Sequence, residues 1–183
     1  MGENLDPHSS PTMRNLKAAL LALLLLSGCA SYDGRGLVAG SSTTADVERV
    51  MGPPREKLPV TGNPLWAGDT VWFYPHNPFG RHTYAVQIAA DGRVRSIEQR
   101  LTVANLQKLV ANETAMRDVR LLFGPPNRVT RNHRGDRQVW EYRMFNQIDI
   151  PYNLYVQYSD DGIVREVLFL RDPSQDMPAP GRH

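Results

Sequence analysis

The sequence predicts an α+β protein of two tandem α-β-β-β repeats, each an antiparallel three-stranded meander with helices packed on one face. The first observation is that the stretch DVERVMGPPRE, residues 46–56, returns 72 residues later as DVRLLFGPPNR, residues 118–128. The second is that runs alternating between apolar and polar residues follow each stretch. The third is an Asp-Gly turn after the second run in both copies. Two copies of one supersecondary unit explain this order.

Each repeat is expected to begin with a helix. The apolar residues recur at helical spacing and form one stripe in each copy: Val47, Val50 and Met51, then Val119, Leu122 and Phe123. Ser42 and Thr114 suit the N-cap because a hydroxyl oxygen accepts a hydrogen bond from a free helical amide. Gly52 and Gly124 fall where a helix ends in a left-handed residue, and the Pro pair after each cannot continue a helix. The repeated Gly-Pro-Pro is therefore interpreted as a helix stop.

Three strands are expected after each stop, at 70–74, 82–89 and 93–101 in the first copy and at 138–145, 153–159 and 163–170 in the second. In the run QVWEYRMF, Trp140 and Tyr142 alternate with polar residues, which is the period-two pattern of a half-buried strand. Val94 and Ile97 lie out of phase in the third strand of the first copy. We therefore expect a bulge or a bent end there.

Residues 1–28 are predicted to be a signal peptide that starts at Met13. Arg14 and Lys17 precede an apolar run at 18–26, the order typical of such a segment. As a helix these nine apolar residues would reach about 13 Å, less than half of a ~30 Å hydrocarbon core. A membrane-spanning helix is therefore not expected, and residues 1–28 are left out of the fold prediction.

The apolar run ends in Leu26-Ser27-Gly28-Cys29, which resembles the lipobox of bacterial lipoproteins. The resemblance implies that Cys29 is acylated, with palmitate among the chains, and that residues 29–36 tether the protein to the membrane. Ala30 rather than Asp after the Cys implies the outer membrane. The alternative is a buried or free Cys29. As the single cysteine of the chain, it has no partner for an intrachain disulfide.

The chain after the tether divides into a first repeat at 37–101, a second repeat at 102–171 and a segment at 172–183. An extra short helix is expected in 102–112, because Val103, Leu106 and Val110 share a helical face. The segment at 172–183 is Pro-rich and polar, and we expect it to be disordered.

The order of helix, G-x-P stop and W-x-Y strand resembles the SmpA/OmlA (BamE-like) domain of outer-membrane lipoproteins. The matching residues are Val47, Gly52, Pro54, Trp72 and Tyr74 in the first repeat and Val119, Gly124, Pro126, Trp140 and Tyr142 in the second. The resemblance covers about residues 37–171 and implies a part in β-barrel assembly. The assembly factor of that family carries one such domain, whereas two are expected here. Tandem copies of a related fold occur in the β-lactamase inhibitor protein, which implies a surface that binds an enzyme.

The sequence gives little support to catalysis, cofactor binding or nucleic-acid binding. The formal net charge is only +2. The P-loop, dinucleotide-binding and nucleophile-elbow patterns are absent. His76 and His82 flank a loop that holds no Cys, Asp or Glu to complete a metal site. We therefore expect no enzymatic activity, no cofactor and no metal, and a hydrolase without a known motif is the enzymatic alternative.

By strand parity, five residues on the sheet face opposite the helices form a candidate partner-binding surface: Gln87, Arg95, Tyr155, Gln157 and Arg165. Tyr and Arg among polar neighbours suit protein binding. A plainly solvated face predicts the same pattern, so both interpretations stay open.

An Arg-rich loop is a second candidate site. Its residues Arg128, Arg131, Arg134 and Arg137 would contact anionic lipid headgroups if the short tether holds the folded part near the membrane. The alternative is an ordinary solvated turn.

These observations predict an outer-membrane lipoprotein, lipid-anchored on the periplasmic face. It would act as a non-catalytic binding or scaffold module in outer-membrane protein assembly or envelope integrity, with an envelope protein, such as the β-barrel assembly machinery, as partner. The alternative is an inhibitor-like binder of an extracytoplasmic enzyme.

Overall fold

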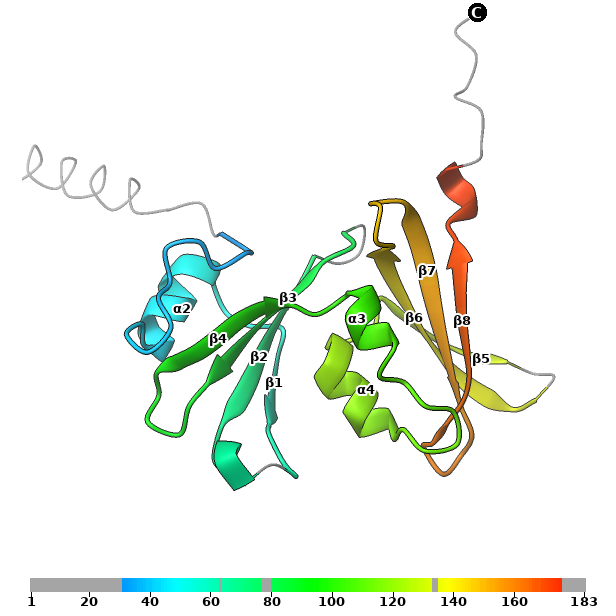
Figure 1. Cartoon of the computed structure of the whole chain (residues 1–183), viewed down its shortest axis with the longest axis horizontal. Helices are drawn as coiled ribbons and strands as arrows, with labels where there is room; N and C mark the ends of the chain where they lie inside the picture. The colour runs from blue at the N-terminus through cyan, green and yellow to red at the C-terminus, as the bar shows by residue number, and fades with distance from the viewer. Residues whose placement is uncertain (1–30, 63, 77–79, 133–134, 176–183) are drawn as a thin grey trace, which may run out of the picture. The chain divides into compact units, whose positions relative to one another are not determined.

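The computed structural model describes residues 31–62, 64–76, 80–132 and 135–175. The chain divides into a unit at Met1–Ala30 and a unit at Ser31–His183, and every described residue belongs to the second. That unit is an α+β fold with two antiparallel sheets (Figure 1). The predicted signal peptide and Cys29 lie outside the described residues.

The first sheet has four strands in the order β1-β2-β3-β4. Its elements are α2 at Thr44–Met51, β1 at Glu56–Pro59, the 3-10 helix η1 at Pro64–Trp66, β2 at Thr70–Pro75, β3 at Thr83–Ile88 and β4 at Val94–Gln99.

The second sheet has four strands in the order β5-β6-β7-β8. Its elements are α3 at Val103–Leu106, α4 at Met116–Phe123, β5 at Arg128–Asn132, β6 at Arg137–Phe145, β7 at Pro151–Tyr158, β8 at Val164–Arg171 and the 3-10 helix η2 at Pro173–Gln175.

The predicted three-stranded meanders are therefore wrong by one strand each. β1 and β5 follow the Gly-Pro-Pro stops and pair with β2 and β6, for example Leu58 with Val71 and Val129 with Trp140. β1 is short and ends in Pro59, and all five residues of β5 are exposed. The sequences of the two strands, EKLP and RVTRN, do not alternate between apolar and polar residues, so the sequence pattern did not reveal them.

Both long helices begin one residue later than predicted. The N-cap of α2 is Thr43, whose hydroxyl accepts a hydrogen bond from the Asp46 amide at 3.3 Å. Ser42 Oγ instead accepts from the amide of Val38 at 2.9 Å. The N-cap of α4 is Ala115, whose amide donates to the Asp118 carboxylate at 3.3 Å.

The W-x-Y motif fixes each helix stop to its sheet. Gly52 and Gly124 end α2 and α4 with φ of 78° in both, a conformation that residues with a Cβ rarely adopt. The Tyr74 hydroxyl donates to the Gly52 carbonyl at 3.3 Å, and the Tyr142 hydroxyl donates to the Gly124 carbonyl at 3.2 Å. The tyrosine of the motif therefore has a structural role in both copies.

The bulge expected in the third strand of the first copy is confirmed. The pairing of β3 with β4 shifts register between Gln87 and Ile88. The pairing of β7 with β8 shifts between Gln157 and Tyr158. The chain before each long helix also bridges to the turn before the last strand, through Thr43 with Arg93 and Ala115 with Ile163.

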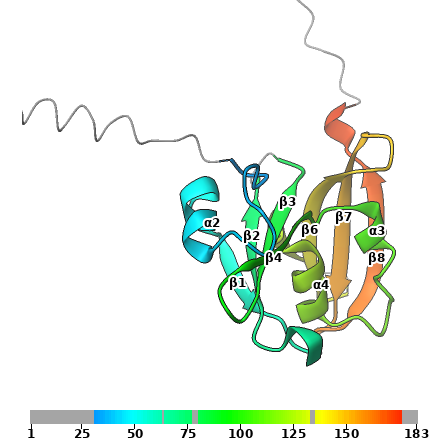
Figure 2. The same ribbon diagram turned by 60° about the vertical axis from the view of Figure 1, so that its left-hand side comes forward.

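Each sheet has a near face that packs on its own long helix. Val47 and Met51 of α2 join Trp72, Tyr74 and Val86 in one buried cluster. In the second sheet, residues of α4 join the near-face residues of β6 and β7 in a larger one: Val119 and Phe123 with Trp140, Tyr142, Met144, Leu154 and Val156. Both views show α2 beside the first sheet and α3 and α4 beside the second (Figures 1 and 2).

The opposite faces, called the far faces below, differ from each other. The far face of the first sheet carries a second buried cluster of Val71, Phe73 and Ala85. It lies against the end of α4, since a Cβ placed on Gly124 would come within 2.6 Å of Phe73. The prediction of helices on one face only is therefore wrong for the first sheet.

Two shorter segments also differ from prediction. α3 ends at Leu106, and Val110 is 46% exposed rather than on a shared buried face. The start of the segment expected to be disordered is ordered, because Asp172 is buried and pairs with Arg81 and η2 follows it, and residues 176–183 lie outside the described residues.

Candidate functional site

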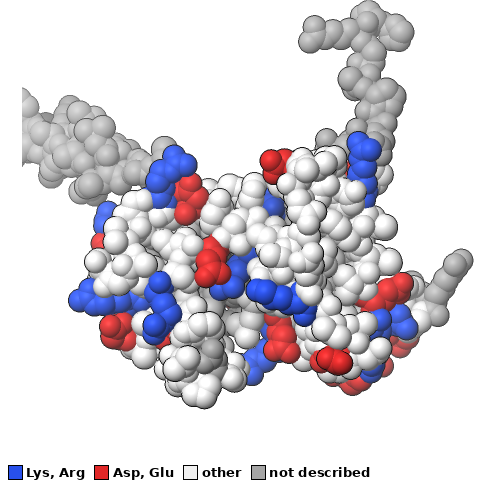
Figure 3. All heavy atoms as spheres, in the orientation of Figure 1, with Lys and Arg blue, Asp and Glu red and all other residues white. Residues whose placement is uncertain are grey.

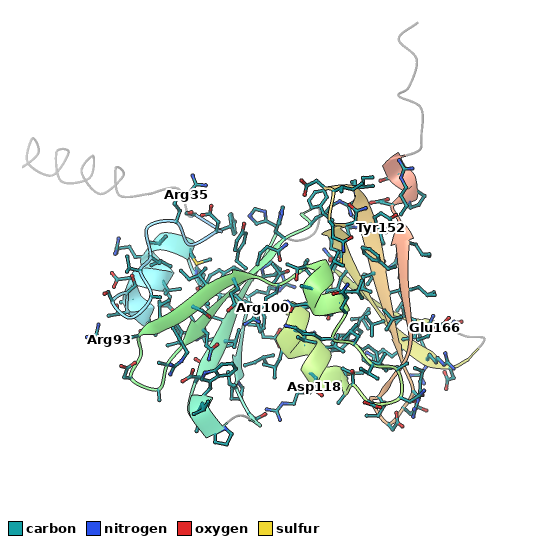
Figure 4. The ribbon with its side chains drawn as sticks, viewed as in Figure 1. Arg35, Arg93, Arg100, Asp118, Tyr152 and Glu166 are labelled. Atoms are coloured by element: carbon teal, nitrogen blue, oxygen red, sulfur yellow. The ribbon has the colours of Figure 1, made fainter. Side chains whose placement is uncertain are left out.

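The far face of the second sheet is the strongest candidate surface, because no helix of the described residues covers it. It carries Arg128 and Thr130 of β5, Val139 and Glu141 of β6, Tyr155 of β7 and Leu168 of β8, placed there by the register of the strands. In Figure 4, Glu166 likewise lies on the side of β8 away from α3 and α4. The surface is therefore a mixture of charged, aromatic and aliphatic side chains.

Tyr155 lies at the centre of this face. Its register partners are Glu141 on β6 and Leu168 on β8, and its ring is half-buried between the neighbouring strands. Its hydroxyl lies 3.5 Å from the Asn153 amide nitrogen. Gln157 is on the same face but is buried at 7% exposure. The register places the two residues on one face, and only Tyr155 is accessible.

Gln87 is buried and Arg95 is 43% exposed, and both bind one buried carboxylate, which corrects the prediction of a shared exposed surface on the first sheet. Gln87 is buried at 6% exposure and donates to the Asp69 carboxylate at 2.6 Å. Arg95 Nε donates to the same carboxylate at 2.7 Å. The hydrogen bond from Arg95 lowers the pKa of Asp69, burial opposes this, and the bond from Gln87 adds to the lowering. Arg95 neutralises this buried carboxylate and Gln87 donates a further hydrogen bond to it, and the sequence pattern did not single out Asp69.

Arg165 lies in the bulge of β8 and ties the turn before that strand to the chain before α4. Its guanidinium donates to Ser159 Oγ at 2.7 Å, to Asp161 at 2.5 Å and to Asn112 at 3.0 Å. Through these hydrogen bonds the side chain holds the turn before β8 against the chain before α4. Arg165 therefore has a structural role in this turn.

Two of the three described arginines of the Arg-rich loop pair with neighbouring acids. Arg131 pairs with Asp136 at 2.6 Å and with Asp160 at 3.2 Å, and Arg137 pairs with Glu166 at 3.4 Å. Among the described residues Arg128 has no ion pair, and Arg134 lies outside them. Figure 3 likewise shows acidic and basic side chains interspersed over the visible face. The ion pairs reduce the attraction that anionic headgroups would feel.

The two described histidines, His76 and His82, pack against aromatic rings. His76 meets the Tyr32 ring at 4.5 Å between centroids, and His82 lies 5.5 Å from the Phe145 ring. Burial lowers the pKa of His82, and the nearby His76 adds to this effect.

No group of three His, Cys, Asp or Glu residues in the described part of the chain is placed to hold a metal ion. Within those same residues, no helix has the length and apolar character to cross a membrane.

A contact that the sequence analysis missed joins α4 to the far face of the first sheet. Arg120 of α4 donates to the Glu56 carboxylate of β1 at 2.9 and 3.1 Å. A largely apolar groove of about 490 Å³ lies beside this ion pair, lined by Leu58, Leu121 and Trp140 among others. In the sequence, one feature could have indicated this contact: the two repeated stretches carry opposite charges at the positions of Arg120 and Glu56.

The comparisons with known proteins add little. No protein-family model matches the chain, and a search of the curated proteins finds no match. Among solved structures, the chain is similar to a crystal structure of a DUF4309 family protein (YjgB) from Bacillus subtilis subsp. subtilis str. 168. The identity is 22% over 77% of this chain and 90% of that chain, with a TM-score of 0.28. This similarity is too distant to assign a fold or a function.

Proposed function

We propose that this chain is a lipoprotein of the outer membrane that binds a protein partner on its periplasmic side without catalysing a reaction. The observation that carries the binding role is the far face of the second sheet, uncovered among the described residues and centred on Tyr155. Tyr in a polar surround is a common anchor in protein interfaces. The lipobox-like sequence before Cys29 supports the location.

The two halves, residues 37–101 and 102–171, are on this proposal duplicated copies of one BamE-like unit. The support is the 72-residue offset of the helix and stop, together with two sheets of four strands in the same order. Matching register shifts in β3/β4 and β7/β8, and matching bonds from Tyr74 and Tyr142, add to it.

The lipid anchor is tested by labelling cells with palmitate analogues. The unaltered chain is expected to take up label and to fractionate with the outer membrane. A Cys29→Ser variant is expected to take up none, because it lacks the thiol that would carry the acyl chains. Label in the variant, or no label in the unaltered chain, would contradict the proposal.

The partner is tested by photocrosslinking in intact cells. A benzoylphenylalanine at position 155 is expected to capture an envelope protein, which mass spectrometry would identify. The same probe at the exposed Glu113, which lies before α4, is the matched control and should give no such product. If both positions capture the same proteins, or neither does, the surface is not a specific contact site.

The place in outer-membrane assembly is tested by depletion. If the chain serves this process, its loss lowers the amounts of β-barrel proteins in the outer membrane. Unchanged amounts of β-barrel proteins would contradict a role in their assembly and favour the alternative, an inhibitor-like binder of an enzyme. In that case the purified protein would co-elute with one extracytoplasmic enzyme and lower its turnover.

A further inference from the structure

The contact between the two halves provides a template for a contact between two molecules. Arg120 projects from α4 onto the far face of the first sheet and pairs with Glu56 at 2.9 Å. Both side chains are largely buried, at 28% and 22% exposure. Glu56 belongs to the far face because it pairs in register with Phe73. This bond joins a helix of one half to a sheet of the other.

The duplication places two further residues at the corresponding positions. Counting 72 residues back from Arg120 gives Glu48 of α2, and counting 72 on from Glu56 gives Arg128 of β5. Both members of the pair have changed sign, so Glu48 and Arg128 are again complementary. This step depends on the duplication stated under the proposed function.

Both corresponding residues are accessible. Glu48 is 50% exposed on α2 and pairs with Lys57 at 3.2 Å. Arg128 is exposed on the far face of the second sheet, opposite Glu141, and has no ion pair in the described part of the chain. Glu141 itself pairs with Arg143, at 3.8 Å.

The C-terminal ends of α4 and α2 differ in whether a sheet lies in front of them. A Cβ on Gly124 would meet Phe73 at 2.6 Å, whereas a Cβ on Gly52 would meet nothing within 4 Å. The two glycines share a φ of 78°. The end of α2 therefore has the geometry that α4 uses to approach a sheet, with open space in front of it.

We propose that α2 of one molecule docks on the far face of the second sheet of another copy of this chain, with Glu48 of the first paired to Arg128 of the second. The two surfaces are different, so the contact is head-to-tail and generates a ring or an open row rather than a symmetric dimer. In a row, only the terminal molecule keeps its Tyr155 face free for an envelope protein.

Lys57 does not block this contact. Its ammonium group lies 3.6 Å from the centre of the Trp72 ring, so it keeps a favourable partner when Glu48 turns to Arg128. The far face of the second sheet is more polar than that of the first, since Glu141 and Tyr155 stand where Phe73 and Ala85 stand. The association is therefore weaker than the internal contact and gains from a membrane tether that raises local concentration.

Charge reversal tests the proposal. Two differently tagged copies of the full chain are co-expressed, solubilised in mild detergent and co-precipitated. E48R alone and R128E alone are each expected to lower recovery of the second copy by about tenfold or more. The double variant E48R/R128E, and the co-expression of one single variant with the other, should restore it. R117E, at an exposed arginine of α4, is the matched control and should leave recovery unchanged.

Cross-linking gives a second readout that needs no reversal of charge. A chain carrying both E48C and R128C, treated in intact cells with a short bismaleimide, is expected to give a ladder of covalent oligomers. A chain that carries only E48C or only R128C beside an acylated Cys29 should give at most a dimer. A chain carrying E48C with E113C is the control and should give no ladder.

The outcomes separate this inference from the proposed function. A palmitate-labelled chain that shows neither co-precipitation nor a ladder overturns head-to-tail association and leaves the lipoprotein proposal standing. Co-precipitation of the second copy that none of the charge variants changes would also overturn head-to-tail association. A chain that takes up no label but forms a charge-dependent ladder rejects the lipid anchor alone.

Discussion

The far faces of the two sheets occupy corresponding positions and have different surroundings. In the first sheet, Phe73 and Ala85 are buried against the end of α4. In the second, the register places Glu141 and Tyr155 at those positions, and no described helix lies over them. The difference shows that two sheets of the same strand order can use this face as part of a core in one case and as a surface in the other.

The exchange of Phe73 for Glu141 is the sharpest part of this contrast. Phe73 is fully buried, whereas the Glu141 side chain is 16% exposed and pairs with Arg143 at 3.8 Å. A buried aromatic ring contributes through the apolar area that it removes from water and through packing. A partly exposed ion pair at this long separation contributes little. The two positions should therefore respond very differently to truncation.

Phe73→Ala is expected to have the largest effect, lowering the free energy of unfolding by about 3–5 kcal/mol. Glu141→Ala should change it by less than about 1 kcal/mol. Urea unfolding of the chain followed by tryptophan fluorescence measures both. Similar losses at the two positions would mean that the far face of the second sheet is also part of a core.

Gly124→Ala and Gly52→Ala give the next contrast. Both residues have positive φ, which costs about 1–3 kcal/mol for a residue with a Cβ. At Gly124 the added atom would also come within 2.6 Å of Phe73, which adds about 1–3 kcal/mol of overpacking. Gly52 has open space and incurs only the first cost. Equal destabilisation in urea would show that α4 does not approach the first sheet this closely.

Asp69→Asn is expected to lower stability at pH 6 by about 1–3 kcal/mol, because the charge-assisted bonds from Arg95 and Gln87 are weakened. The pKa of Asp69 lies below its usual 3.8 in the folded protein. Its contribution is therefore present above that value and is lost as the pH falls through the lowered pKa. Urea unfolding at pH 6 and pH 3 should show the variant and the unaltered chain converging in acid.

Asp160→Asn is the control for this measurement, since that side chain is 82% exposed. It should shift the unfolding free energy at pH 6 by no more than about 0.5 kcal/mol. A gap between Asp69→Asn and the unaltered chain that persists unchanged at pH 3 would contradict the assignment of a charged Asp69.

Periodicity explains which parts of the fold the sequence could predict. The stripe of Val119 and Phe123 and the alternation of Trp140 and Tyr142 arise from burial of one side, so they located a helix, a strand and their shared core. The bulge in the last strand of the first sheet was visible as Val94 and Ile97 falling out of phase. A pattern that reports burial cannot locate an edge strand such as β5, whose residues are all exposed.

The candidate site was less predictable because parity assigns a face but not its surroundings. Gln87 and Gln157 occupy the same register position, opposite Val71 and Val139. Gln87 donates a hydrogen bond to the buried Asp69. Gln157 lies on the far face of the second sheet, which no described helix covers. Asp69 precedes a strand and belongs to no motif, so nothing in the sequence marked it. The acylation of Cys29 stays a prediction.

Tyr142→Phe and Tyr74→Phe give the smallest expected effects and compare the two helix stops directly. Each hydroxyl donates to the carbonyl of a helix-ending glycine, Gly124 or Gly52. Removing a buried hydroxyl that leaves its acceptor unpaired costs about 1 kcal/mol. Tyr142 is fully buried beneath α4, while Tyr74 is 3% exposed and its bond is 0.1 Å longer at 3.3 Å against 3.2 Å. Tyr142→Phe should therefore lower the free energy of unfolding in urea slightly more than Tyr74→Phe. A larger loss for Tyr74→Phe would contradict the inference that the helix stop at Gly124 is better shielded from water than the one at Gly52.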